Sequence, residues 1–317
     1  MRTTKDSPAA LATASPARHL GGAVWAALLI VYVVWGSTYL GIRVVVETVP
    51  PFLSSGGRFI IAGLLMTGLI AWRFGPGALR VTWPQLRSAL VVGLLLLLGG
   101  NGMVVLAETA VPSGLAALLV AAVPMWVAVF RAATGDRPPV RTLTGVGVGM
   151  GGLAVLTLPG LSGEIKLWGV VLVLIGTVLW SLGTFSSARL PMPKNPFTAS
   201  AYEMLGGGVA SLTVAFVRGE QHGFSFAEVS TRSWVAFGYL IVFGSLVAFS
   251  AYAWLLQSAP LSLVSTYAYV NPVVAVLLGA LILGEALTWP IVVGGAIVVA
   301  GVVVIVSTER RGRAGSS

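Results

Sequence analysis

Ten long apolar segments, separated by short connections, constrain the fold of this chain more than any other feature of its sequence. A helix needs about 20 apolar residues to cross the roughly 30 Å hydrocarbon core of a bilayer. Only 9% of the 317 residues are charged, which leaves too little polar surface to cover a soluble domain of this size. The sequence therefore predicts an all-α integral membrane protein with ten transmembrane helices, over residues 23–42, 53–72, 86–107, 112–131, 140–158, 167–188, 197–217, 234–256, 261–283 and 288–307.

The composition excludes several other classes of protein. Apolar residues make up 56% of the chain, and they occur in continuous runs rather than in the alternation of a porin-type barrel. The absence of cysteine excludes disulfides, thiolate catalysis and iron–sulfur clusters. The net charge of +9 falls in short loops, where it reports membrane topology rather than nucleic-acid binding.

The distribution of Lys and Arg predicts the orientation. With the N-terminus in the cytoplasm, 14 of the 19 basic residues fall on the inside, 4 fall on the outside, and Arg58 lies within a helix. Cytoplasmic loops carry such an excess of basic residues, so both termini are predicted to be cytoplasmic. Residues 1–22 and 308–317 are predicted to be cytoplasmic tails, and the first, which is rich in Ala, Pro and Ser, is predicted to be disordered.

The two halves of the chain resemble each other at near-constant offsets of 145 to 149 positions. The matching residues are Trp35 with Trp180, Pro51 with Pro196, Arg58 with Glu203, Pro112 with Pro260, Pro124 with Pro272, and Gly135, Gly145 and Gly152 with Gly284, Gly294 and Gly301. Each repeat, over 23–158 and 167–307, holds five predicted helices. Because five is odd, the second copy must enter the membrane from the opposite side, and such inverted repeats are typical of secondary transporters.

A set of local motifs gives the chain a family resemblance that covers residues 23–306. These motifs are Trp35-Gly36-Ser37-Thr38-Tyr39, Pro51 with Arg58-Phe59, Gly100-Asn101-Gly102-Met103 with Glu108, Pro112 to Ala117 with Pro124, Asn271-Pro272, and Leu283-Gly284-Glu285. The chain resembles the drug/metabolite transporter superfamily, with two EamA-type repeats, and looks closest to its YedA-like exporters. The first repeat departs from the family by having Gly135-Asp136 in place of Gly-Glu. The resemblance implies export of small metabolites, often amino acids or related compounds, across the bacterial inner membrane.

The sequence offers no machinery for ATP hydrolysis or for membrane catalysis. A Walker A loop needs a lysine that follows glycine, and none does among Lys5, Lys166 and Lys194. Histidine and aspartate, which metal sites and acid–base catalysts use, fall outside the predicted spans, at His19, His222, Asp6 and Asp136. We therefore predict that the protein is not an enzyme, and that it uses no cofactor, metal, ATP or nucleic acid.

Polar and aromatic residues within the spans are the candidates for contact with a solute. They are Trp35, Ser37, Thr38, Tyr39, Arg58, Asn101, Trp180, Tyr202, Glu203, Tyr267 and Asn271. Trp35 and Trp180 lie about 18 Å into their helices at 1.5 Å per residue, near the midplane of the membrane. They either face a substrate cavity or pack in the interior. Other aromatic residues that either line this cavity or belong to ordinary packing are Phe185, Tyr252, Trp254 and Tyr269, whereas Trp83, Trp234 and Trp289 are assigned to the interfacial belt.

Arg58 and Glu203 occupy equivalent positions in the two repeats, seven residues after Pro51 and Pro196. Charges within a membrane are costly and suggest a function. One hypothesis pairs the two side chains across a central cavity, where Arg58 either attracts a substrate carboxylate or holds Glu203 ionised, and Glu203 carries a proton. The alternatives are a static ion pair, or two side chains that extend separately to opposite interfaces.

Proline and glycine indicate two further features. Pro124 and Pro272 each free the backbone carbonyl four residues before them, at Val120 and Ala268, which marks either a transport site or a tolerated kink. The glycines of 140–158 and 288–307 indicate close helix packing, and the family resemblance implies that these two helices pack on each other. On this basis we expect that Gly147→Leu would lower the yield of folded protein.

These observations together predict a secondary transporter that exports a small organic metabolite by alternating access. The partners are a small-molecule solute, the lipid bilayer and, as a hypothesis, the proton. The main alternative is a membrane binding or sensory protein of the same fold that transports nothing.

Overall fold

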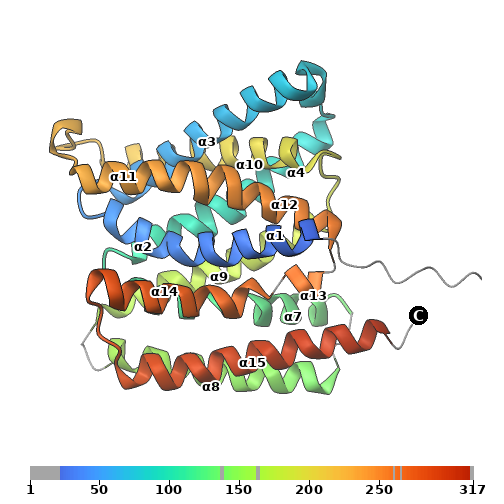
Figure 1. Ribbon diagram of the computed structural model, residues 1–317, viewed down its shortest axis with the longest axis vertical. Helices are drawn as coiled ribbons and strands as arrows, with labels where there is room; N and C mark the ends of the chain where they lie inside the picture. The colour runs from blue at the N-terminus through green and yellow to red at the C-terminus, as the bar shows by residue number, and fades with distance from the viewer. Residues whose placement is uncertain (1–21, 136–138, 162–164, 260, 265, 315–317) are drawn as a thin grey trace, which may run out of the picture.

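The computed structural model describes residues 22–135, 139–161, 165–259, 261–264 and 266–314, and all regular structure in these ranges is helical (Figure 1). The elements are α1 (Gly22–Ile30), η1 (Val31–Trp35), α2 (Gly36–Val45), α3 (Pro51–Phe74), η2 (Pro76–Leu79), α4 (Trp83–Gly93), η3 (Leu94–Gly102), α5 (Met103–Ala107), α6 (Ser113–Val120), α7 (Val123–Ala133), α8 (Val140–Leu161), α9 (Leu167–Ser187), α10 (Pro196–Val217), η4 (Phe226–Glu228), α11 (Thr231–Tyr239), η5 (Leu240–Val247), α12 (Ala248–Ser258), α13 (Leu261–Val264), α14 (Tyr267–Leu283) and α15 (Trp289–Ala314).

Seven helical stretches within the described residues are long and apolar enough to cross a membrane: Gly22–Val45, Pro51–Phe74, Trp83–Ala107, Ser113–Ala133, Leu167–Ser187, Pro196–Val217 and Thr231–Ser258. Three shorter apolar helices occur at Val140–Leu156, Val270–Leu283 and Trp289–Val304. The all-helical membrane architecture is therefore confirmed, and the count of ten spans stays a prediction.

The two prolines that the repeat pairs with each other both begin a helix. Pro51 is the first residue of α3, and Pro196 is the first residue of α10. Proline suits this position because its missing N–H would have no intrahelical partner there. Asn195 caps α10 by accepting a hydrogen bond of 2.9 Å from the backbone N–H of Phe197. The paired prolines thus mark equivalent helix starts in the two halves.

The proline-containing spans are interrupted at different points. The fourth stretch breaks at 121–122 and resumes as α7, where Pro124 lies in the first turn. In the second half the turn lies at Thr266, and Pro272 is inside the continuous helix α14. The expectation of matching interruptions at Pro124 and Pro272 is therefore met only at Pro124.

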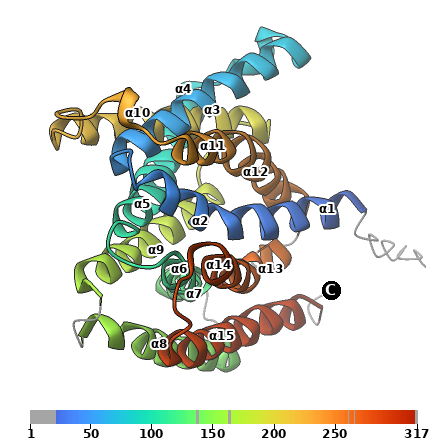
Figure 2. The same cartoon turned by 60° about the vertical axis from the view of Figure 1, so that its left-hand side comes forward.

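The helices form a bundle in which α8 and α15 lie side by side at one edge and α3 and α10 lie together at the other (Figures 1 and 2). The bundle has two ends. We call the end where α1 begins and α15 finishes the terminal face, and the other end, where α2 finishes and α15 begins, the opposite face (Figure 1). The first and last described residues, Gly22 and Ala314, therefore lie on the same side of the bundle.

Backbones approach each other closely where α8 meets α15, as predicted for the two glycine-rich helices. A methyl group at Gly152 would lie 2.7 Å from the backbone nitrogen of Val298, and one at Gly301 would lie 2.7 Å from that of Gly149. Neither position has room for a side chain. Gly147, in contrast, faces open space with nothing within 4 Å of its Cβ position. The expectation that Gly147 contributes to this contact is therefore wrong, because that residue lies on the outer face of α8.

We expect Gly152→Leu to lower the yield of folded protein strongly, and Gly147→Leu to leave it close to wild type. The larger side chain at Gly152 must push α15 away, and overpacking of this kind typically costs about 1–3 kcal/mol or more. Monodisperse protein measured by fluorescence-detected size-exclusion chromatography reports the result. Equal loss of folded protein in the two variants would contradict the packing described here.

Candidate functional site

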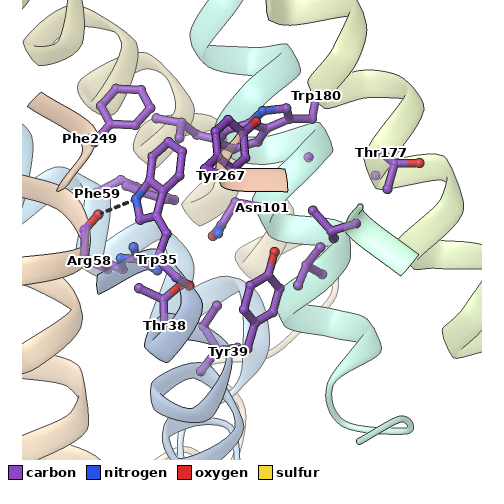
Figure 3. A pocket seen from close by; sticks show the side chains of 17 residues that line it. Trp35, Thr38, Tyr39, Arg58, Phe59, Asn101, Thr177, Trp180, Phe249 and Tyr267 are labelled. Atoms are coloured by element: carbon purple, nitrogen blue, oxygen red, sulfur yellow. Dashed lines mark hydrogen bonds between the residues drawn. The ribbon is translucent and has the colours of Figure 1, made fainter. Parts of the chain in front are cut away.

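A central cavity of about 70 Å³ lies within the bundle (Figure 3). Both halves of the chain contribute to its walls. The lining residues are Trp35, Thr38, Tyr39, Ile42, Arg58, Phe59, Leu97, Gly100, Asn101, Val104 and Val120 from the first half, and Gly176, Thr177, Trp180, Gly244, Phe249 and Tyr267 from the second. A ligand in this cavity would therefore contact both repeats at once.

Five aromatic side chains, which we call the aromatic cluster, pack together at this cavity: Trp35, Trp180, Phe249, Tyr252 and Tyr267. Trp35 is at its centre, in edge-to-face contact with Trp180 at 5.8 Å between ring centroids and with Tyr267 at 5.4 Å. The indole N–H of Trp35 donates to the carbonyl oxygen of Gly244 at 3.2 Å, which holds the ring across the cavity (Figure 3). Such aromatic pairs add about 0.5–1.5 kcal/mol each beyond the area that they bury.

Arg58 brings a positive charge into this apolar interior. Its side chain is only 5% exposed, and its Nε donates to the hydroxyl of Ser245 at 2.8 Å. Its Nη1 has no hydrogen-bond partner among the described residues. Gly244 makes room for the guanidinium, because a Cβ at that position would lie 2.9 Å from Nη2. A buried cation with a free donor is costly unless an acceptor reaches it.

Asn101 contributes the complementary group. Its Oδ1 is buried and has no hydrogen-bond partner among the described residues, and the side chain lines the same cavity as Arg58 (Figure 3). The cavity therefore presents one unpaired donor and one unpaired acceptor. Thr38 does not add to this pair, because its hydroxyl donates to the carbonyl of Trp35 at 2.7 Å.

Three segments of π-helix border the central cavity: η1, η3 and η5. They supply Trp35, Asn101 and Gly244 respectively. Segments of this kind are rare and occur frequently at functional sites, because they change the direction of side chains within a continuous helix. In η3 the backbone also approaches a neighbour closely, since a Cβ at Gly100 would lie 2.7 Å from the ring of Trp180.

A second cavity, of about 220 Å³, lies nearer the terminal face, and we call it the terminal-face cavity. Glu203, which is 6% exposed, lines it together with Thr184, Tyr252 and Gln257. Phe249 lines both cavities. The aromatic cluster therefore stands at the boundary between the two.

Arg58 and Glu203 consequently face different cavities. No ion pair joins them in the part of the chain that the structure describes, where Arg58 bonds Ser245 and the ion pair Arg218–Glu220 spans 3.5 Å near the opposite face. The hypothesis of a direct Arg58–Glu203 pair is therefore wrong for this conformation. Equivalent positions in the two repeats did not bring the side chains to the same side of the aromatic cluster.

Seven of the eleven predicted site residues line the central cavity: Trp35, Thr38, Tyr39, Arg58, Asn101, Trp180 and Tyr267. Glu203 lines the terminal-face cavity. The other three make contacts between helices. Ser37 lies 2.5 Å from the hydroxyl of Tyr239, and Tyr202 donates to the carbonyl of Leu79 at 2.7 Å. With its amide nitrogen as the donor, Asn271 bonds the carbonyls of Tyr32 at 3.1 Å and Tyr267 at 3.3 Å.

The other aromatic candidates have different locations. Tyr252 belongs to the aromatic cluster, and Phe185 packs against Phe130 and under the guanidinium of Arg189. Trp254 lines a groove on the outside of the bundle. The side chain of Tyr269 lies outside the described residues.

Sequence reasoning did not include ten of the seventeen residues that line the central cavity, and Thr177 and Phe249 are two of them. Thr177 lies one helical turn before Trp180 on α9, and this spacing could have identified it. Phe249 follows directly after a π-helical segment, and no periodicity in the sequence indicates which way it points. Among the described residues, no group of three or more His, Asp or Glu side chains is arranged to hold a metal ion.

Polar contacts between helix ends close the bundle at the opposite face. Glu285 accepts hydrogen bonds from the backbone N–H of Ser113 at 2.8 Å and of Gly114 at 3.1 Å, so it caps α6 from the far end of α14. Glu220 caps α3 in the same way, accepting from Phe52 at 2.8 Å. At the terminal face, in contrast, Gln257 is an exposed residue on the rim of a cavity.

A family model matches nearly the whole chain, over residues 21–158 and 167–307, and it describes the EamA-like transporter family. The chain belongs to this family. Sequence reasoning had proposed this family from the motifs alone, and the match confirms it. Together with the apolar helical stretches, membership identifies a multi-pass membrane protein of a transporter family.

The chain is similar to other bacterial proteins over most of their length. The Escherichia coli K12 protein named "uncharacterized inner membrane transporter YedA" is 39% identical over 84% of this chain and 84% of its own. A Streptantibioticus cattleyicolor protein named "probable terminal-alkyne amino-acid exporter" is 29% identical over 90% of this chain and 94% of its own. A solved crystal structure, at 21% identity and a TM-score of 0.63, covers 89% of this chain and 95% of its own, and shows a common fold.

We expect Glu285→Ala to lower the thermal unfolding midpoint of the detergent-solubilised protein, and Glu47→Ala to leave it unchanged. The first substitution removes the acceptor that caps α6, and the loss of a helix cap typically costs about 0.5–2 kcal/mol. Glu47 is an exposed residue near the same face and serves as the matched control. An unchanged midpoint in Glu285→Ala would show that this contact does not hold the opposite face together.

Proposed function

We propose that this protein is a secondary transporter of the bacterial inner membrane that exports a small organic metabolite by alternating access. The observation that carries the proposal is the central cavity, which both halves of the chain enclose and which contains two unpaired buried polar atoms. Binding sites between the halves near the midplane are typical of transporters with inverted repeats. The inner-membrane location is supported by the name of the Escherichia coli relative.

The chemistry of the unpaired atoms favours an amino acid as the solute. Arg58 Nη1 offers a charged donor that matches a carboxylate, and Asn101 Oδ1 offers an acceptor that matches an ammonium group. The aromatic cluster supplies an apolar and quadrupolar surface for a side chain. The name of the Streptantibioticus relative agrees with this substrate class. At about 70 Å³ the cavity must widen before it can hold such a solute.

Alternating access is supported by the pattern of helix contacts. If residues 23–158 and 167–307 are inverted repeats, symmetry pairs the stretch 22–45 with 167–187 and the stretch 83–107 with 231–258. The stretch 22–45 packs on the stretch 231–258, through α1 with α12 and α2 with α11. The stretch 167–187 packs on the stretch 83–107, through α9 with η3 and α5. Each contact is the counterpart of the other, as a pseudo-two-fold axis requires.

The described conformation corresponds to one end of the transport cycle. Glu285 and Glu220 join helix ends at the opposite face, whereas the terminal-face cavity reaches exposed residues, and this difference supports the assignment. With both termini in the cytoplasm, as the excess of basic residues predicts, this is an inward-facing state. A solute that moves from the terminal-face cavity to the central cavity must displace the aromatic cluster.

Glu203 is the proposed proton carrier, and this part of the proposal does not need an ion pair with Arg58. Its carboxyl lies in the terminal-face cavity, next to Tyr252 of the aromatic cluster. Protonation there would remove a charge from the wall of the entry path. The competing mechanism is facilitated diffusion without proton coupling.

A non-transporting membrane receptor of the same fold is the main alternative. It would bind the same solutes without moving them. Flux of radiolabelled amino acids into proteoliposomes separates the two functions, because a receptor binds without uptake into the lumen.

We expect Arg58→Gln to weaken amino-acid transport by at least about tenfold, because a hydrogen bond to a charged group is worth roughly 1.5–3 kcal/mol. The exposed Arg87 on α4 gives a matched control, and Arg87→Gln should transport as wild type does. The measurement is initial flux at subsaturating substrate, at equal amounts of folded protein. Wild-type flux in Arg58→Gln would contradict the proposal that Arg58 binds the carboxylate of the solute.

We expect Glu203→Gln to abolish the dependence of flux on a pH gradient, while Glu228→Gln, at an exposed position, should retain it. Because Arg58 and Glu203 lie in separate cavities, the free-energy effects of the two substitutions should add in the double variant. If Glu203→Gln keeps both the flux and the pH dependence of wild type, facilitated diffusion or another carrier is the correct mechanism.

A further inference from the structure

A third hollow, which we call the lateral groove, lies on the outside of the bundle near the terminal face, with a volume of about 580 Å³. Its walls come from α1, the last turns of α3, the start of α10, and η5 with α12. The lining residues are Ala23, Ala27, Met66, Leu69, Ile70, Trp72, Arg73, Phe74, Phe197, Leu246, Val247, Ser250, Ala251 and Trp254. Apart from Arg73 and Ser250, every one of these side chains is apolar.

Helix α12 contributes one face to the lateral groove and another face to the terminal-face cavity. Val247, Ser250, Ala251 and Trp254 follow each other at the three- and four-residue spacing of one helix face, and they line the groove. Phe249, Tyr252, Ala253 and Leu256 follow at the same spacing and line the cavity. The groove therefore opens away from the solute pathway.

The groove exists because α3 leaves the bundle at its C-terminal end. In its first half α3 packs against η5 and α10, and towards the terminal face it diverges from α12 (Figure 1). One face of this last part is exposed, with Leu69 at 52% and Trp72 at 81%, whereas Met66 and Ile70 are buried against the bundle. In a membrane-spanning chain, an apolar surface of this kind faces lipid chains rather than water.

The lateral groove contains one charged side chain, Arg73, and a positive charge complements an anionic lipid headgroup. Arg73 lies at the terminal-face end of the groove, one residue before the end of α3, and its guanidinium is exposed. The guanidinium lies over the ring of Phe74, 5.4 Å from the ring centroid, and it forms no ion pair within the described part of the chain. Trp72 and Trp254 add the amphipathic rings that are enriched at the depth of lipid headgroups.

We propose that the lateral groove is a binding site for an anionic phospholipid, with the phosphate at Arg73 and an acyl chain along the wall formed by Leu246 and Trp254. An apolar channel that ends in an unpaired guanidinium complements a molecule with an apolar chain and an anionic head. Clefts between transmembrane helices that combine these features recognise anionic headgroups. The site depends only on insertion of the chain in a membrane, so it stands independently of the transport function proposed above.

The other candidate occupant is residues 1–21, which continue from the start of α1 beside Ala23. This segment carries Arg2, Lys5 and Arg18 and a single acidic residue, Asp6. Its net positive charge repels Arg73, whereas an anionic headgroup attracts it. Charge complementarity therefore favours the lipid.

Photolabelling of the full-length protein in proteoliposomes tests the proposal. The probes are phosphatidylglycerol and phosphatidylcholine with the same diazirine-bearing acyl chain, and peptide mass spectrometry locates the crosslinks. We expect phosphatidylglycerol to label 66–74 and 246–254 preferentially. Arg73→Gln should reduce this labelling by about fivefold, the equivalent of the roughly 1 kcal/mol that one basic side chain contributes near an anionic lipid.

Arg80→Gln is the matched control, because Arg80 is an exposed arginine on the same side that does not line the groove. It should retain wild-type labelling, which shows that the loss in Arg73→Gln is not a general effect of reduced charge. Equal labelling of these segments by the two probes, or equal loss in the two variants, would overturn the proposal. So would a rise in labelling on deletion of residues 1–21, which would identify the tail as the occupant.

Discussion

The hydrocarbon core of a bilayer offers no hydrogen bonds, and this constraint explains where the structure departs from regular helix. Backbone groups within the membrane must find partners in the protein, so irregular segments occur only where protein or a cavity surrounds them. Here η1, η3, η5 and the break between α6 and α7 all adjoin the central cavity. Helix α8, which lies at the edge of the bundle and contributes no residue to the central cavity, is continuous (Figure 1). Irregular backbone therefore marks the site independently of any side chain.

The same constraint gives weight to the unpaired atoms of Arg58 and Asn101. In water each would be solvated, but in a closed cavity each carries a cost that a bound group can remove. Both atoms belong to residues that line the central cavity, to which both halves of the chain contribute. For the proposed transporter, this arrangement would favour a solute with opposite charges at a short separation over a purely apolar one.

The sequence predicted the apolar helical stretches and seven of the seventeen residues that line the central cavity, and the family resemblance implied the contact of α8 with α15. Neither predicted which direction each side chain takes. Trp35 and Trp180 could be placed by depth because 1.5 Å per residue converts position into height. Depth did not distinguish Gly147 from Gly152, which lie on different faces of α8, or show that Arg58 and Glu203 face different cavities. The π-helical segments add to this difficulty, because each changes the rotation of every residue that follows it. Phe249 was missed for that reason.

Helix α12 acts as a partition with solute space on one side and bilayer on the other. One face of α12 lines the terminal-face cavity, and another face lines the lateral groove on the outside of the bundle. A shift of this one helix must enlarge one space at the expense of the other, since the interior of a protein is close-packed and the displaced volume has to go somewhere. The lateral pressure of the membrane would thereby affect the volume of the terminal-face cavity. If α12 moves in this way during the proposed transport cycle, lateral pressure and acyl-chain length would act on a wall of the cavity that Glu203 lines, without any contact between lipid and solute.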